Sequence, residues 1–68
     1  MEIKTYRNKR NSHKFIDVKV TGCRHYMWRQ QMRFDNGVIN NVGTKKGGFR
    51  RQHKETINDV LKDYEVVT

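Results

Sequence analysis

The sequence has no proline, a single cysteine and no long run of apolar residues. The lone cysteine, Cys23, excludes an intramolecular disulfide, and a small secreted domain without disulfides would be unusual. No apolar stretch is long enough to cross a bilayer or to form the core of a signal peptide. These absences predict a cytoplasmic protein with no membrane partner.

Hydrophobic residues are scarce as well. They make up 34% of the 68 residues, and charged residues make up 32%, a balance that approaches that of disordered chains. Three Tyr, three Phe and one Trp nevertheless supply large packing groups. The length allows one domain, residues 1–68, and such a domain buries only about 60% of the surface of its unfolded chain. We therefore expect a thin core and low stability.

Acidic residues are rare in most of the chain. Residues 1–54 contain fourteen of the fifteen Lys and Arg residues but only three of the seven acidic residues, a net charge of +11. Residues 55–68 contain one lysine and four acidic residues, a net charge of −3. Such an excess of one sign suggests a polyanionic partner, and we expect that partner to be DNA or RNA.

Alternation of apolar and polar residues predicts two strands, 14–21 and 25–34. In the first, β-branched side chains share one face: Ile16, Val18 and Val20. In the second, the side chains that share one face are Tyr26, Trp28, Gln30, Met32 and Phe34. Asp35-Asn36-Gly37 is a strong hairpin signal, so a third strand should begin at Val38.

Two registers are open for this hairpin. With a three-residue loop, Phe34 pairs with Val38 on the Trp28 face, and Ile39 and Asn41 lie on the opposite face. With a two-residue turn, Phe34 pairs with Ile39, and Val38 changes face. The first register buries Val38 and Val42 on the Trp28 face, whereas the second buries only Ile39 there, so we favour the first.

A helical stripe follows at i, i+3, i+4 and i+7: Ile57, Val60, Leu61 and Tyr64. The helix is expected to begin between Phe49 and Lys54 and to cover the Trp28 face of the sheet. The predicted fold class is α+β, with the order β-β-β-α: a three-stranded antiparallel sheet covered on one face by one C-terminal helix. Residues 1–6 could add a short N-terminal strand. Sheet-based DNA-binding domains, such as the arm-binding regions of integrases, resemble this architecture, without a shared motif.

The sheet face opposite the helix is expected to be open and basic. Arg side chains suit guanine edges or phosphates, and Asn and Gln suit adenine edges. The candidate contact residues on this face are Lys19, Arg29, Gln31, Arg33 and Asn41. A basic arm expected to be mobile, 7–14, and a basic glycine-rich loop, 43–51, would flank the face and hold phosphates. Their candidate contact residues are Arg7, Lys9, Arg10, Lys14, Lys45, Lys46, Arg50 and Arg51.

A solvated sheet face is normally charged, so these residue types by themselves also suit a surface without a partner. The excess of one sign favours a binding surface, because mixed charges would serve solubility equally well. The alternative function is a small protein-interaction module, an adaptor, inhibitor or regulator, that docks on an acidic partner surface. A homodimer is a variant of this alternative, because a thin core gains from a dimer interface.

No catalytic or metal-binding pattern emerges from the sequence. Cys23 and His25 are too close together for the usual zinc knuckle. The sequence offers no base together with an orienting group that would activate Cys23 as a nucleophile. Residues 43–48 lack the spacing of a phosphate-binding P-loop. We therefore expect no enzymatic activity, no cofactor and no metal ion.

Overall fold

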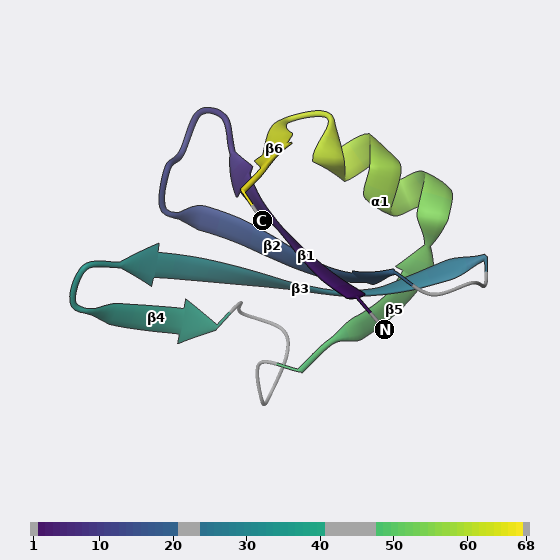
Figure 1. Ribbon diagram of the computed structural model, residues 1–68, viewed down its shortest axis with the longest axis horizontal. Coiled ribbons are helices and arrows are strands. Elements are labelled where there is room, and N and C mark those ends of the chain that lie inside the picture. Colours follow the sequence, from purple (N-terminus) through teal and green to yellow (C-terminus); the bar gives the residue numbers. More distant parts are fainter. Residues whose placement is uncertain (1, 21–23, 41–47, 68) are drawn as a thin grey trace.

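The computed structural model describes residues 2–20, 24–40 and 48–67. These form one six-stranded antiparallel sheet that carries a single helix on one face (Figure 1). The elements are β1 (Glu2–Asn8), β2 (Lys14–Val20), β3 (His25–Phe34), β4 (Gly37–Asn40), β5 (Arg50–His53), α1 (Lys54–Leu61) and β6 (Tyr64–Val66). The order across the sheet is β4-β3-β2-β1-β6, and β5 pairs with β3 on the same side as β4.

The predicted α+β fold with a three-stranded sheet is wrong, because β1, β5 and β6 extend the sheet to six strands and the described part of the chain is mostly β. β1 pairs with β2 and with β6, so it lies inside the sheet. β5 has the sequence RRQH, in which no apolar alternation signals a strand. It forms because β3 is ten residues long and β4 pairs only with its last four residues, which leaves the first four to pair with β5.

The helix is shorter than the predicted stripe. It begins at Lys54, the late limit of the prediction, and ends at Leu61. Tyr64 therefore lies in β6, where it pairs with Asn8 of β1. Tyr64 is buried nevertheless, because the chain turns back after the helix and returns it to the same core. No helix in the described part of the chain is long and apolar enough to cross a membrane.

A two-residue turn, Asp35–Asn36, joins β3 to β4 and matches neither expected pairing. Phe34 pairs with Gly37, whose φ of 153° is rarely adopted by residues with a side chain. Gly37 is thus the first residue of β4. Val38 consequently lies on the face opposite the helix and Ile39 on the helix face, the reverse of the favoured register.

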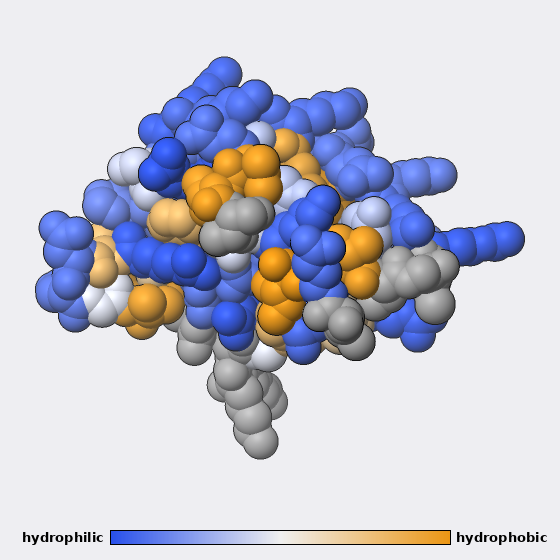
Figure 2. Space-filling model, viewed as in Figure 1, coloured by the Kyte–Doolittle hydropathy of each residue, from blue (hydrophilic) through white to orange (hydrophobic). Residues whose placement is uncertain are grey.

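The core lies between α1 and the sheet face that carries Trp28. Its buried apolar residues are Ile16, Val18, Ile57 and Tyr64, and Tyr6, Tyr26, Trp28 and Leu61 pack around them. The helix contributes one buried side chain, Ile57, whereas Val60 of the predicted stripe is exposed. Figure 2 shows several separate hydrophobic patches on an otherwise hydrophilic surface. So small a core leaves much apolar surface in water, which limits stability.

Candidate nucleic-acid interface

The sheet face opposite α1 carries polar and charged side chains in rows. Residues directly opposed on neighbouring strands share a face, so the strand pairings define each row. One row contains Gln31, Phe15, Arg7 and Glu65. The next contains Arg29, Asp17 and Thr5, and the third contains Arg51, Met27, Lys19 and Ile3. We call this surface the open face.

Asp17 is the centre of the open face. Its side chain is only 3% exposed, and its carboxylate accepts hydrogen bonds from three residues. Thr5 Oγ1 donates to Oδ1 at 2.8 Å, Arg29 Nε donates to Oδ2 at 2.9 Å, and Arg33 Nη2 donates to both oxygens at 3.0 and 3.2 Å. A buried carboxylate needs such partners, because burying an unpaired charge is costly. Asp17 therefore holds both guanidinium groups in defined positions.

Arg33 is oriented by two further contacts. Its Nε donates to Gln31 Oε1 at 3.2 Å, and its Cζ lies 4.6 Å from the centroid of the Phe15 ring. Both contacts hold the plane of the guanidinium group. The side chain remains 35% exposed, so the oriented group can still be reached by a ligand.

Phe49 lies just before β5 and folds over the open face. Lys19 Nζ lies 4.1 Å and Arg29 Cζ 4.7 Å from the centroid of its ring. Such cation–π contacts orient the charged groups and cover part of them. Sequence reasoning missed Phe49 because it lies in the segment expected to be loop. The available signal was an aromatic residue inside a basic, glycine-rich stretch.

An ion pair reduces the positive charge at the β6 edge of the open face. Arg7 Nη2 lies 3.0 Å from Glu65 Oε1, and both side chains are exposed. Exposed pairs of this kind contribute little to stability, but they offset each other's charge. The positive part of the open face is therefore centred on β2, β3 and β5.

The thirteen predicted contact residues fall in four places. Six lie on the open face: Arg7, Lys19, Arg29, Gln31, Arg33 and Arg51. Lys14 and Arg50 pair with Met32 and Trp28 and so belong to the helix face. Lys9 and Arg10 lie in the hairpin between β1 and β2. The remaining three, Asn41, Lys45 and Lys46, lie outside the described residues.

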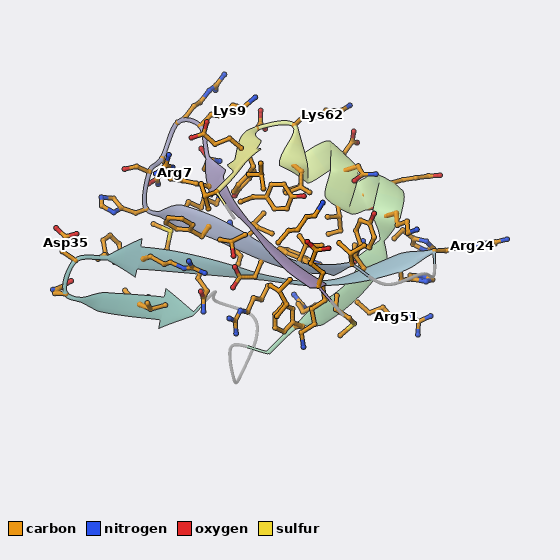
Figure 3. The ribbon with its side chains drawn as sticks, in the orientation of Figure 1. Arg7, Lys9, Arg24, Asp35, Arg51 and Lys62 are labelled. Carbon is orange, nitrogen blue, oxygen red and sulfur yellow. The ribbon has the colours of Figure 1, made fainter. Side chains whose placement is uncertain are left out.

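The segment 7–14 comprises the end of β1, a turn and the start of β2. Asn8 Oδ1 accepts hydrogen bonds from the amides two and three residues further on, at 2.9 and 3.0 Å. The amide of Lys9 donates to the carbonyl of Asp63 at 2.9 Å, and its Nζ donates to the carbonyl of Lys62 at 3.4 Å. Figure 3 shows Lys9 and Lys62 together on the side of the sheet that carries α1. Lys9 is thus directed away from the open face.

A second group of cations lies where β3 begins and β5 ends. His25 pairs with His53, and their ring centroids are 4.3 Å apart. Arg51 Nη2 lies 3.4 Å from His25 Nδ1, and Arg24 directly precedes β3. Figure 3 shows Arg24 and Arg51 at the same end of the molecule. We call these four residues the basic corner; sequence analysis selected only Arg51 among them.

The basic corner changes the titration of one histidine. Desolvation, followed by the positive charges of Arg51, His53 and Arg24, lowers the pKa of His25 below its ordinary value of 6.5. In residues 2–20, 24–40 and 48–67, no three His, Cys, Asp or Glu side chains are grouped so that they could hold a metal ion. Cys23, weighed above as a ligand, lies outside these ranges.

No family model, no curated protein and no solved structure matches this chain. The function is therefore inferred from the chain's own residues and their arrangement.

Proposed function

We propose that the protein binds nucleic acid through the open face. The observation that supports this most directly is the arginine pair anchored on Asp17. Arg29 and Arg33 are oriented by a buried carboxylate, yet their side chains remain 32% and 35% exposed. A planar guanidinium matches the geometry of a phosphate or a guanine edge. Because the groups are oriented in advance, less conformational entropy is lost on binding.

The rest of the open face suits the same partner. Lys19 and Arg51 add positive charge beside the arginine pair. The rings of Phe15 and Phe49 already contact cations of the face, and bases stack on such aromatic and guanidinium planes. A formal net charge of +8 would speed association with a polyanion. The proposed role is binding, without catalysis or a cofactor, and the cytoplasm is the proposed location.

Titration of labelled duplex DNA, single-stranded DNA and RNA at two salt concentrations tests the proposal. We expect at least one of them to bind and to be released steeply by salt, because each phosphate neutralised on duplex DNA contributes about 0.9 to the log–log slope. Absence of binding to all three at low salt would overturn the proposal.

A charge-conserving substitution tests the guanidinium geometry. Arg33→Lys keeps the positive charge but loses the planar group that Gln31 and Phe15 orient. We expect it to weaken binding about tenfold. Arg50→Lys is the matched control, because Arg50 is exposed on the helix face, and it should change the affinity less than about twofold. Equal effects of the two substitutions would contradict a specific role for Arg33.

Two further substitutions separate oriented arginines from simple charge attraction. Asp17→Asn and Asp35→Asn each remove one negative charge, and Asp35 is exposed in the turn between β3 and β4. We expect Asp35→Asn to tighten binding slightly. Asp17→Asn should weaken it about threefold or more, because the arginine pair loses its anchor. Circular dichroism establishes that both variants are folded at the assay temperature. Equal tightening by both substitutions would show that net charge alone determines the affinity for nucleic acid.

Docking on a partner protein is the second candidate, and one observation favours it. β4 is an edge strand among the described strands, and it exposes Val38 and Ile39 to 57% and 58%. An apolar edge strand can pair with a strand of another chain. Purification with a stoichiometric protein, and without nucleic acid, would favour this candidate.

A further inference from the structure

We infer that the basic corner is a proton-coupled binding site for one phosphate-class anion. The anion chemistry is that of a phosphodiester of nucleic acid or of a free phosphate or sulfate ion. The inference rests on the proposed function only for the first source, in which the corner would hold a backbone phosphate beside the arginine pair. His25, His53 and Arg51 lie on the open face with the arginine pair, and Met27 lies between His25 and Arg29 along the same face of β3.

The geometry brings three potential donors together. The pairing of β3 with β5 places His25 opposite His53, with the ring planes inclined by 40° at a centroid separation of 4.3 Å. Arg51 Nη2 approaches His25 Nδ1 at 3.4 Å. Protonated imidazoles and a guanidinium are all donors, so this arrangement can present N–H groups from three side chains to a single tetrahedral anion.

The charges around His25 favour an anion at this position. The charged groups that lower its pKa, after desolvation, are Arg51, His53 and Arg24, and all of them are basic. Further charged residues on the neighbouring elements include Lys19 on β2, Arg50 on β5, and Lys54 and Glu55 at the start of α1. Protonation of His25 is thus opposed by like charges before any ligand binds. A bound anion would relieve this repulsion.

Anion binding should therefore be coupled to protonation. Near neutral pH, without an anion, His25 is mostly neutral, because its pKa lies below 6.5. A bound anion stabilises the protonated imidazole and raises this pKa, so binding takes up a proton. Affinity for the anion then rises as the pH falls. A phosphodiester keeps its charge over this pH range, so the pH dependence would report on the protein.

The first test uses the full chain and inorganic sulfate, whose charge does not change between about pH 5.5 and 7.5. NMR follows the histidine ring protons during a sulfate titration at each pH. We expect sulfate to raise the pKa of His25, to shift the ring signals of His53, and to bind about three- to tenfold more tightly at the lower pH. His13 serves as an internal control, because it lies beside Phe34 at the other end of β3. Its ring signals should not respond to sulfate.

Substitutions then assign the effect to the corner. Arg51→Gln should weaken sulfate binding about threefold or more. His25→Gln should abolish most of the pH dependence, whereas the matched variant His13→Gln should retain it. Sulfate binding that keeps its full pH dependence in His25→Gln would overturn the inference.

An oligonucleotide titration at the same two pH values identifies the source of the anion. Binding that strengthens at low pH in the wild type, but not in His25→Gln, supports a nucleic-acid phosphate. Sulfate binding without oligonucleotide binding supports a site for a free anion and overturns only the proposed function. Oligonucleotide binding that ignores pH, with His25 unmoved by sulfate, overturns the corner site and leaves the proposed function standing.

Discussion

Asp17→Asn removes the charge that organises the open face while preserving the shape of the side chain. Removing one partner of a buried ion pair costs about 3–5 kcal/mol, because the other charge is left uncompensated. Here the guanidinium partners are Arg29 and Arg33, whose side chains are 32% and 35% exposed and can be partly solvated after the substitution. The asparagine oxygen can also still accept one hydrogen bond. We therefore expect the free energy of unfolding to fall by about 2–3 kcal/mol.

This loss would be large for so small a domain. At about 0.05–0.15 kcal/mol per residue, a chain of this length has an unfolding free energy of roughly 3–10 kcal/mol. The expected loss lowers the melting temperature by about 10–20 °C. Urea unfolding followed by the fluorescence of Trp28, which packs against the core, measures the free energy directly.

Two controls calibrate the result. Thr5→Val removes one uncharged donor to Asp17 and should cost about 1 kcal/mol. Asp35→Asn changes an exposed turn residue and should stay within about 0.5 kcal/mol of the wild type. In a double-mutant cycle, Asp17→Asn and Arg33→Met should show a coupling of at least about 1 kcal/mol. Additive effects, together with a loss below about 0.5 kcal/mol for Asp17→Asn alone, would refute the anchoring role.

Three other substitutions test the core, the hairpin and the basic corner. Ile57→Ala truncates a side chain that is 1% exposed and should lower the unfolding free energy by about 2–4 kcal/mol in urea titrations; a loss under about 1 kcal/mol would contradict its place in the core. Gly37→Ala should cost about 1 kcal/mol because of the φ of 153°, although no atom lies within 4 Å of the added Cβ; an unchanged melting temperature would exclude this backbone cost. Because the folded state lowers the pKa of His25, the wild type should lose stability as the pH falls below 6.5, and His25→Gln should lose less. Urea midpoints at about pH 5.5 and 7.5 measure this difference, and His13→Gln should behave like the wild type.

Local patterns predicted two of the strands well. The period-two alternation of residues 14–20 and 25–34 depends on which side chains must leave water, and neighbouring residues alone reveal it. The same alternation indicated that the Trp28 face would be buried. It also assigned Lys19, Arg29 and Arg33 to the opposite face, where the strand pairings place them. A side-chain face is a local property, which explains why these predictions needed no knowledge of the fold.

Other elements could not be read locally. β5 is polar and exposed, and it is a strand because β3 extends beyond β4 and offers a free edge to pair with. Tyr64 fits the helical spacing of Ile57 and Leu61, but it reaches the same core from a strand that follows the helix. The hairpin register depended on which turn position Gly37 occupies. The hairpin sequence leaves several pairings open, and the structure selects one.

By itself, the sequence determined the chemistry of this protein: a strongly basic chain, a thin core, two amphipathic strands and an arginine-rich sheet face. Only the tertiary structure decided how that chemistry is arranged. Asp17 accepts hydrogen bonds from Arg29 and Arg33, which lie twelve and sixteen residues away in the sequence, and Arg7 pairs with Glu65 across fifty-eight residues. The basic corner likewise exists only because β5 pairs His53 with His25. These long-range contacts depend on strand order and register, which are set by burial of the whole core, and no local sequence pattern encodes them.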